Sequence, residues 1–378
     1  MAAYMLSSAT NARQVFDDLL HFRTLPKMYW MAHNLMGEDK QEPGVERKQD
    51  IPSHTIFLKQ EFGKKKRGDR IIMTMGSKIT GAGKGTASTR KDTGATPAER
   101  TLTIYVSDWW HGVKVEDVAI SSVRAPFDVE MRMTRGLDDW WARKFDTDIF
   151  HTFYFGYSKN NIDNAVTGAA VTFHPEWFFP SGVAKGWEAG KEGGLNTNHK
   201  MTTRVLNFMH EYALDSDWLP CVYKGDAWFG CVMSESQWTS LFEDPKFEGA
   251  LQRAAMPGDN NPLWTGAKGM WNGTFIHTSN SVADASGTWA FDSAAITGDG
   301  VAGGEKIRRA IYFGGNAIGA GIGQKMKNTV RYDDDHQRID ERGAESIYGF
   351  MRADWGGSIG TLNSAIISTF AEPSYLAA

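Results

Sequence analysis

The chain has 378 residues, of which 41% are hydrophobic and 23% are charged, proportions typical of a folded globular protein. Its formal net charge is −4 at pH 7, which gives no support for a protein that binds nucleic acid through overall basicity. No stretch approaches the roughly 18 to 20 apolar residues of a membrane span, and residues 1–10 lack the basic and apolar regions of a signal peptide. We therefore expect synthesis in the cytoplasm and no membrane partner.

Cysteine and tryptophan content bear on the interior of the protein. Cys221 and Cys231 are too few for a four-ligand zinc site, and we expect both as buried strand residues. The 14 tryptophans include adjacent pairs at Trp109–Trp110 and Trp140–Trp141. Because large aromatic side chains dominate both cores and interfaces, a tryptophan-rich core and a tryptophan-rich subunit interface are both open.

Residues 1–50 are expected to form an N-terminal arm, with a short helix at Asn11–Phe22 before a charged stretch. Residues 51–118 follow with four β-rich runs, at Ile56–Leu58, Ile71–Met75, Leu102–Val106 and Val113–Val115. The connection Gly76–Arg100 is rich in Gly, Thr, Ala and Ser and cannot bury a core of its own. The pattern predicts a long β-hairpin whose tip projects into solvent or onto a neighbour.

The predicted hairpin is basic, with ten Lys or Arg between Lys59 and Lys91 against two acidic residues. We expect it to meet an acidic surface on a partner, such as another copy of the chain; a solvated loop and a phosphate-binding loop are the alternatives. The candidates for contact between subunits are Lys64, Lys65, Lys66, Arg67, Arg70, Lys84, Trp109 and Trp110. Gly81–Thr86 is similar to the end of a nucleotide-binding phosphate loop, but Lys78 occupies the place of its first glycine and no helix-forming run follows.

The clearest helix is predicted over residues 126–155. Pro126 opens it, and Asp128 and Glu130 lie in the first turn, where a helix favours acidic residues. Apolar residues recur three or four positions apart, at Leu137, Trp140, Trp141, Phe145, Ile149 and Phe153. At ~1.5 Å per residue the helix would span about 40 Å, which suits a spine crossing an elongated subunit.

A compact α/β lobe is predicted from Met201 onward, after an extended loop region at 156–200. Its helices are expected from Thr202 or Thr203 to Leu214, at Gln237–Ala255 after a cap by Ser234 or Ser236, and, short and glycine-rich, at Gly314–Gly323. Its strands are expected at Leu219–Tyr223, Ala227–Met233, Thr274–Thr278 and Ile307–Phe313, and further strands at Ser346–Ala353 and Leu362–Phe370 close the chain.

The sequence contains no clear catalytic or metal-binding constellation. His174 lies near Glu176 without a nucleophile beside them, so we expect structural roles for both. Asp333–His336 has residue types that bind metals, but neighbours along an extended chain point to opposite sides, and a solvated turn is favoured over a divalent-ion site. The chain lacks a nucleophile elbow, an H-E-x-x-H motif and paired cysteine motifs. We predict no enzyme activity and no catalytic, cofactor-binding or metal-binding residues.

A second hypothesis is a particle-associated carbohydrate-binding protein or glycoside hydrolase. Carboxylates adjoin tryptophans at Asp108–Trp110 and at Asp138–Trp141, and glycosidases use paired carboxylates. The second set lies within the stripe of the predicted spine helix, where packing accounts for its tryptophans.

Four motifs carry a resemblance to a known family. They are Leu241–Phe247 with a D-P-x-aromatic pattern, Asn261–Gly266 followed by Gly269–Gly273 (N-P-L-W-T-G and G-M-W-N-G), the strand from Ile276 to Val282, and Ile311–Ala317 (I-Y-F-G-G-N-A). Together with the order of elements over residues 50–371, they resemble the major capsid proteins of tailed bacteriophages with the Hong Kong 97-type coat fold, and among these the N-four-type podovirus branch. The loops at 156–200 and 283–305 do not match a family pattern.

The resemblance implies an α+β fold with an arm, an extended loop, a spine helix, and peripheral and axial lobes. The implied ranges are an N-terminal arm at 1–50, an extended basic β-hairpin loop at 51–118, a peripheral domain at 119–200 with the spine helix 126–155, an axial domain at 201–340, and C-terminal strands returning to the peripheral domain at 341–378.

The resemblance also implies a function. The chain would assemble with itself, as hexamers and pentamers, into an icosahedral shell that encloses the double-stranded DNA of a tailed bacteriophage without sequence-specific contact. Scaffolding and portal proteins are expected partners, a decoration protein is an open one, and no cofactor is implied. The protein would reside in the virion capsid after assembly in the host bacterial cytoplasm.

Overall fold

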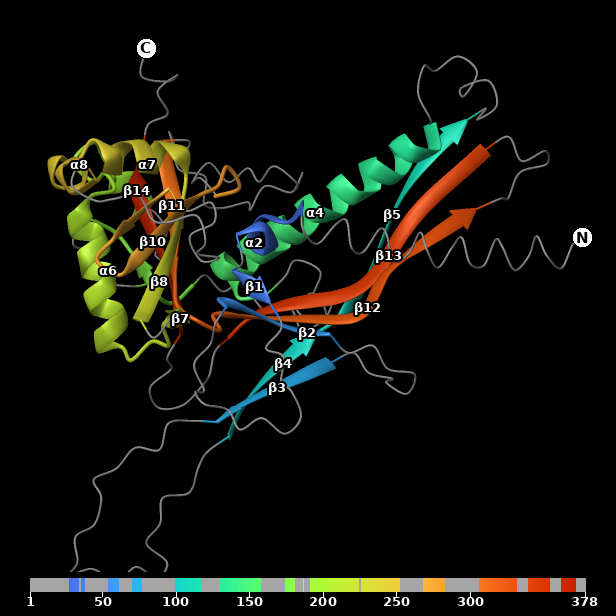
Figure 1. Cartoon of the computed structure of the whole chain (residues 1–378), viewed down its shortest axis with the longest axis horizontal. Helices are drawn as coiled ribbons and strands as arrows, with labels where there is room; N and C mark the ends of the chain where they lie inside the picture. Colours follow the sequence, from blue (N-terminus) through green and yellow to red (C-terminus); the bar gives the residue numbers. More distant parts are fainter. Residues whose placement is uncertain are drawn as a thin grey trace, which may run out of the picture.

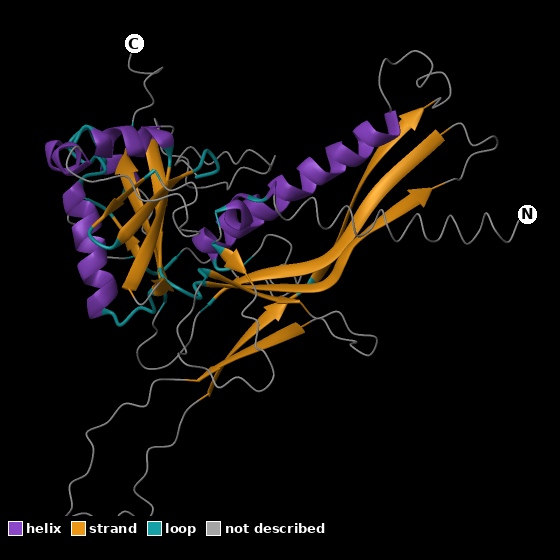
Figure 2. Cartoon of the chain, in the orientation of Figure 1, coloured by secondary structure: helices purple, strands orange, loops and turns teal. Residues whose placement is uncertain are grey.

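The structure is a computed structural model, and it describes residues 27–33, 35–37, 54–60, 70–76, 99–116, 129–157, 174–180, 186, 191–223, 226–251, 268–282, 306–331, 339–353 and 362–371. It has a lobe built on a seven-stranded sheet and an elongated part in which one long helix runs beside a five-stranded sheet (Figures 1 and 2). No helix in these ranges is long and apolar enough to cross a membrane.

The five-stranded sheet forms the elongated part. Its order is β1 (Met36–Gly37), β2 (Ile56–Gln60), β12 (Ile318–Arg331), β13 (Ile339–Arg352) and β5 (Ser107–Glu116). β2 runs parallel to β1 and β12, whereas β13 runs antiparallel to β12 and β5. The two 14-residue strands β12 and β13 curve together away from the lobe (Figure 1), and β5 forms an edge of the sheet.

Helix α4 (Val129–Phe155) lies along this sheet and confirms the predicted spine helix. Its buried stripe repeats every four residues, as expected for one helix face, through Leu137, Trp141, Phe145, Ile149 and Phe153. The stripe packs on β13, where the rings of Phe145 and Tyr348 lie 4.5 Å apart between centroids. Burial of this continuous aromatic surface holds the helix against the sheet.

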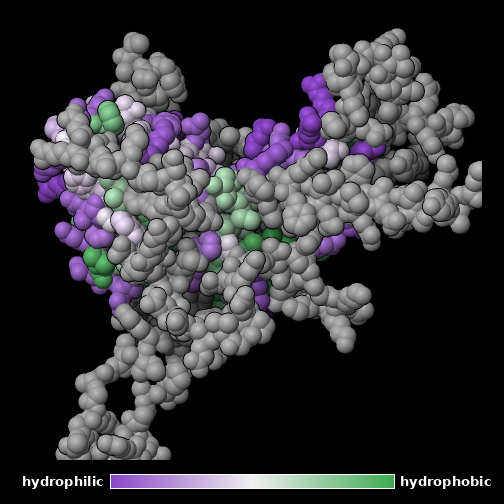
Figure 3. Space-filling model, viewed as in Figure 1, coloured by the Kyte–Doolittle hydropathy of each residue, from purple (hydrophilic) through white to green (hydrophobic). Residues whose placement is uncertain are grey.

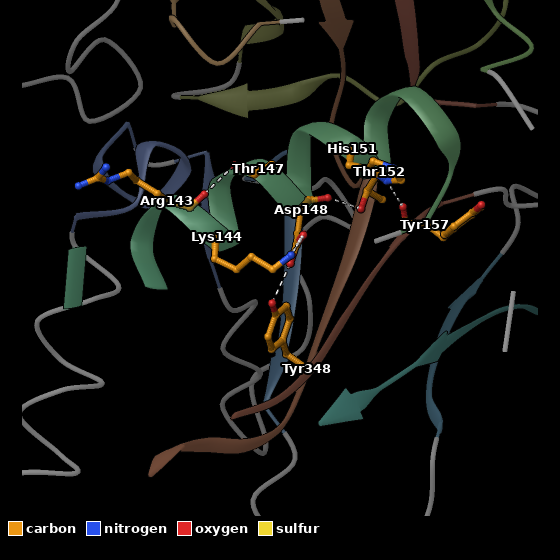
Figure 4. Close-up of polar contacts among 8 residues, drawn as sticks. All are labelled: Arg143, Lys144, Thr147, Asp148, His151, Thr152, Tyr157 and Tyr348. Carbon is orange, nitrogen blue, oxygen red and sulfur yellow. Dashed lines mark hydrogen bonds and ion pairs between the residues drawn. The ribbon is translucent and has the colours of Figure 1, made fainter. Parts of the chain in front are cut away.

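A buried polar contact fixes the helix on the sheet. The Asp148 carboxylate accepts hydrogen bonds from the Lys144 ammonium at 2.8 Å and from the Tyr348 hydroxyl of β13 at 2.7 Å (Figure 4). Since both carboxylate oxygens have donors, burial of this charge is compensated. The Lys144 ammonium also lies over the Trp109 ring, 4.5 Å from its centroid.

A short N-terminal segment lies against α4 and the lobe. Helix α2 (Tyr29–Ala32) places Trp30 5.2 Å from the rings of Phe150 and Phe153 on α4 and 5.9 Å from Phe313 in the seven-stranded sheet. Trp30 is fully buried, so this one side chain joins α2 to both α4 and the seven-stranded sheet. The helix predicted at Asn11–Phe22 lies outside the described residues.

A separate hairpin of β3 (Arg70–Gly76) and β4 (Glu99–Tyr105) crosses the five-stranded sheet. Its strands pair antiparallel, from Arg70 opposite Tyr105 to Gly76 opposite Glu99, which confirms the predicted β-hairpin. The predicted tip falls outside the described residues.

Strand β12 replaces the glycine-rich helix predicted at Gly314–Gly323, and that prediction was wrong. Glycines alternate with apolar residues in Ile318–Gly319–Ala320–Gly321–Ile322, so all the glycines point to one face of the strand. The aliphatic side chains of the hairpin lie on this face. A methyl group on Gly319 would lie 2.6 Å from Leu102 and 2.8 Å from Ile104, so the close approach of the hairpin requires glycine there.

The seven-stranded sheet forms the core of the lobe. Its order is β6 (Trp177–Phe178), β14 (Ser364–Phe370), β11 (Ile307–Phe313), β8 (Asp226–Met233), β10 (Thr274–Thr278) and β9 (Gly269–Trp271), with β7 (Cys221–Tyr223) paired to β8. β8 runs parallel to β10, and β11 runs antiparallel to β8 and β14. Helix α6 (Thr203–Asp215) confirms the predicted helix ending near Leu214.

The predicted helix at Gln237–Ala255 is two helices in the structure, α7 (Glu235–Phe242) and α8 (Pro245–Leu251). Pro245 explains the break, because proline fits the first turn of a new helix and breaks a continuing one. Ser234 begins α7 with a capping box, in which its hydroxyl accepts from the Gln237 amide and the Gln237 side chain accepts from the Ser234 amide.

The chain crosses between the two sheets more often than the predicted domain ranges suggest. β12, which falls in the predicted axial range, pairs with β2 and β13, while β14 near the C-terminus pairs with β11 of the lobe. The predicted boundary at residue 340 therefore falls at the start of β13 and divides strands that pair in one sheet. As divisions of a shell subunit, the predicted ranges stay predictions.

Candidate assembly surfaces

The β5 edge is the first candidate surface for contact with another chain. In the described part of the molecule no strand pairs with the outer side of β5, so its backbone groups are available to a partner strand. Trp110 on this strand is 53% exposed and lies across the face of the sheet. Its indole lies against Gly112 and Gly343, and its Nε1 donates to the Thr329 hydroxyl of β12 at 3.1 Å.

Trp109 and Trp110 have different surroundings because neighbours in a strand face opposite sides. Trp109 points to α4, packs against the core and lies beneath Lys144, and His111 on the same side stacks on Trp140 at 4.0 Å between centroids. Trp110 points away from α4. The predicted pair therefore divides into one side chain inside the subunit and one on its surface.

The β9 edge is a second surface, which we define by Trp238, Phe242, Met270 and Trp271. Phe242 is 48% and Met270 41% exposed. Phe247 contacts both Trp238 and Trp271, with ring centroids 5.5 and 5.8 Å away, and the Trp271 Nε1 donates to Asn207 of α6 at 2.8 Å. Apolar side chains thus flank an edge strand of the lobe, an arrangement typical of interaction sites.

Polar residues line the β9 edge. Glu235 at the start of α7 forms an ion pair with Lys268 and accepts from the Thr278 hydroxyl at 2.9 Å. These partners, the hydrogen bond from Lys268 first, lower the pKa of the Glu235 carboxyl below its usual range. An apolar patch with a charged rim is the usual anatomy of a protein interface. This surface is not evident from the sequence pattern, although the G-M-W-N-G motif lies within it.

The hairpin carries the third surface. Arg70 is exposed, with its guanidinium 5.0 Å from the centre of the Tyr105 ring, and Ile72 is 53% exposed. The Lys59 ammonium donates to the Ile72 carbonyl at 2.7 Å. Lys64, Lys65, Lys66, Arg67 and Lys84 lie outside the described residues, so the predicted contacts of the basic hairpin stay predictions.

The histidine and the two cysteines considered in the sequence, His174, Cys221 and Cys231, are buried in the folded chain. His174 is fully buried; its Nδ1 accepts from the Glu176 amide at 3.0 Å and its Nε2 donates to the Ser364 hydroxyl at 2.9 Å. Burial, with Arg352 nearby, lowers its pKa well below the usual value. Burial raises the pKa of the Cys221 thiol to about 11 and that of Cys231 to about 12, so both thiols stay protonated, as predicted for buried strand residues.

The structure gives no support to the candidate sugar-binding and metal-binding sites among the described residues. Asp138 and Trp141 are buried in the core, so they do not form an open sugar-binding surface. The described residues contain no group of three or more His, Cys, Asp or Glu able to hold a metal ion, and Asp333–His336 lies outside them. The three surfaces above expose apolar and charged side chains suited to contact with another chain.

Comparison with known proteins agrees with this architecture. The family model described as phage capsid protein matches residues 10–368, whereas no curated protein sequence matches the chain. The capsid protein of Ralstonia phage GP4 is similar in structure, with a TM-score of 0.68 at 16% identity over 92% of each chain. The cyanophage Pam1 capsid gives 0.62 at 15% identity over 88% of this chain and 95% of the other.

The head protein of Helicobacter pylori bacteriophage KHP40 gives a TM-score of 0.58 at 10% identity, over 88% of this chain and 94% of the other. Structural likeness at such low identity establishes the α+β Hong Kong 97-type capsid fold, and the sequence match over nearly the whole chain establishes the family. The chain belongs to the phage capsid protein family and is a major capsid protein, a structural component of an icosahedral virion shell.

Proposed function

We propose that copies of this capsid protein form hexamers and pentamers, and that the resulting shell encloses the double-stranded DNA genome of a tailed bacteriophage. The observation that carries the proposal is that the five-stranded and seven-stranded sheets each end in an edge strand with one exposed large apolar residue, Trp110 on β5 and Met270 on β9. Ring-shaped assembly needs two different surfaces per subunit, because head-to-tail contacts join unlike patches.

The proposal includes further partners and a place of assembly. Scaffolding and portal proteins guide closure of the shell in the host bacterial cytoplasm, and the chain itself acts without cofactor or catalytic activity. The motifs in Leu241–Phe247 and Gly269–Gly273 support placement in the N-four-type podovirus branch. The ranges 119–200 and 201–340 correspond, in this proposal, to the peripheral and axial parts of the shell subunit.

Nuclease protection tests the enclosed cargo. Particles that contain this chain are purified from infected cells, treated with nuclease, and then opened, and the protected nucleic acid is digested separately with DNase and RNase. We expect a DNase-sensitive duplex of uniform genome length. Protected RNA, or particles that protect no nucleic acid at any stage of infection, would contradict the proposal.

A further inference from the structure

The outer edge of β5 is complementary to itself. In the described part of the molecule β5 ends the five-stranded sheet, and a twofold axis perpendicular to the sheet would lay a second β5 antiparallel beside it. An axis through His111 places residues opposite each other that lie equally far from His111 on its two sides. Contacts about a twofold axis are isologous, so each complementary pair occurs twice.

The charged residues match in this register. Asp108 and Lys114, both exposed, lie three residues to either side of His111, so Asp108 of each copy faces Lys114 of the other. Lys114 also lies opposite Glu341 of β13, and the joined sheet would place its ammonium between two carboxylates. Opposite charges directly across a strand pair are favourable. A shift by two residues in either direction separates Asp108 from Lys114 of the second copy, so the charges select this register.

The apolar residues match in the same register. Trp109 and Val113 lie on the side of the sheet that faces α4 and pack against the core of the subunit, and Trp109 of each copy comes opposite Val113 of the other. Aromatic and β-branched residues are favourable cross-strand partners. On the opposite face Trp110 meets Gly112 of the second copy, and a glycine there leaves the indole in place across the sheet. The core of one subunit would thus continue into the next.

His111 lies on the axis and faces its own copy. Its ring stacks on Trp140 with the centroids 4.0 Å apart, and burial lowers the pKa of His111 below its usual value. The two imidazoles are therefore neutral at pH 7, and no like charges meet at the axis.

Helix α4 leaves this edge accessible. It lies over β5 and β13, since Trp140 stacks on His111 and the ring of Phe145 contacts Tyr348. Strands of a sheet are ~4.8 Å apart, so the two α4 helices of a joined pair would lie about 10 to 14 Å apart, and helices pack at ~8 to 10 Å. Figure 3 shows hydrophilic residues along the outer edge of the molecule where α4 runs, so the apolar part of this contact comes from β5.

We propose that β5 pairs antiparallel with β5 of a second copy about a twofold axis at His111, which joins the two five-stranded sheets into one. The proposal rests on the proposed function and deepens it, because head-to-tail contacts build each hexamer or pentamer and a separate, isologous contact must join neighbouring rings. The β5 edge supplies that contact, while the exposed indole of Trp110 on the face of the sheet stays open to a neighbour within the ring.

A strand of a different protein is the competing occupant of the β5 edge, because any unpaired edge offers backbone groups to a partner strand. We favour a second copy because one register matches the charged pair and the apolar pairs at the same time. A foreign strand has no reason to find these residues arranged symmetrically about His111.

Cysteine crosslinking of the full-length chain tests both the pairing and its register. The double variant Asp108→Cys, Lys114→Cys carries thiols that meet only between two copies, because six residues of one strand span ~20 Å and a disulfide joins Cα atoms ~4.4 to 6.8 Å apart. The two single variants are the matched controls, and wild type controls for the buried thiols of Cys221 and Cys231. Shells assembled with the scaffolding partner are oxidised and analysed by non-reducing gel electrophoresis.

We expect the double variant to give a reducible dimer as its main product and each single variant to stay monomeric. His111→Cys is an independent test, since one thiol on the axis faces its own copy and should also give the dimer. Monomers from both of these variants, or a single control that crosslinks as well as the double variant, would overturn the proposal. A ladder of larger products would indicate head-to-tail pairing of β5 and would overturn the twofold contact.

Electron cryo-microscopy of the wild-type shell gives the same answer without a substitution. We expect the β5 strands of two copies ~4.8 Å apart where neighbouring rings meet, with His111 opposite its own copy. Closed shells in which solvent or a different chain lies along β5 would refute this pairing alone. A wild-type chain that forms no shells with its scaffolding partner would refute the proposed function itself.

Discussion

At the scale of single residues, the packing of α2 on α4 buries the carboxyl group of Asp146 and changes its protonation. Its carboxylate on α4 accepts from the backbone of α2, while its Oδ1 is buried without a hydrogen-bond partner among the described residues. Burial raises the pKa of this carboxyl to about 7, against the lowering effect of the amides of Tyr29 and Trp30. The ionised form is therefore unfavourable in the folded chain.

Asp146→Asn tests that cost. Between pH ~4 and ~7 the folded state holds a proton on Asp146 that the unfolded state has released, so the stability of wild type falls as pH rises through this window and is then level. The variant lacks this loss. We expect its free energy of unfolding, relative to wild type, to rise from pH 4 to pH 8 by on the order of 2 to 4 kcal/mol, measured by chemical denaturation.

The exposed Asp139→Asn serves as the control for Asp146 and should show no comparable rise over the same pH range. Buried His174, whose pKa is lowered, acts on wild type and both variants alike, so it cancels in the comparison. A relative stability of Asp146→Asn that is independent of pH would contradict the assignment.

The tryptophan pair separates folding from assembly. Trp110→Ala removes an exposed ring, so we expect a melting temperature close to that of wild type and markedly fewer closed shells, because exposed aromatic residues contribute most to interfaces. Trp109→Ala removes a side chain packed against the core and should lower the free energy of unfolding by about 2 to 4 kcal/mol. Calorimetry and sedimentation measure the two effects; shells formed normally by Trp110→Ala would exclude the β5 edge as an interface.

At the scale of elements, the sequence predicts the helices and strands whose residue pattern fits only one type of secondary structure. The stripe from Leu137 to Phe153 repeats with a helical period over many turns, so α4 is evident from the sequence. Glycine positions do not distinguish a helix from a strand in this way, because glycine has no side chain to bury on one face. The segment with Gly319 and Gly321 was therefore wrongly predicted as a helix. In the structure these glycines let the hairpin approach β12 closely.

Gly319→Val tests this close approach. The added side chain must displace Leu102 and Ile104, and such overpacking costs about 1 to 3 kcal/mol. We expect the variant to remain folded, as judged by circular dichroism, with a displaced hairpin and impaired assembly. Gly136→Ala on α4 is the control: a methyl group there has no atom within 4 Å and should stabilise the helix by about 0.5 to 1 kcal/mol. Normal shells formed by Gly319→Val would show that close packing of the hairpin on β12 is not needed for assembly.

At the scale of the whole molecule, the family and the order of elements could be predicted, whereas the surfaces could be predicted only in part. The motifs around Asp244 and Gly269 are packing and turn signatures, and they identified the capsid family. The β9 edge could not be predicted because the exposure of a strand depends on whether it lies at the end of a sheet. The order of strands depends on pairing between distant segments, such as β8 and β10, and the local sequence pattern does not determine that pairing. The same non-local pairing places β14 in the lobe.

We propose that copies of this shell subunit meet through the β5 edge, the β9 edge and the hairpin. The most direct test is electron cryo-microscopy of particles formed by the full-length chain with its scaffolding partner. We predict closed icosahedral shells in which Trp110 and the Phe242–Met270 region are buried between neighbouring copies. A chain that remains monomeric, or a shell in which both edges face solvent, would contradict the account.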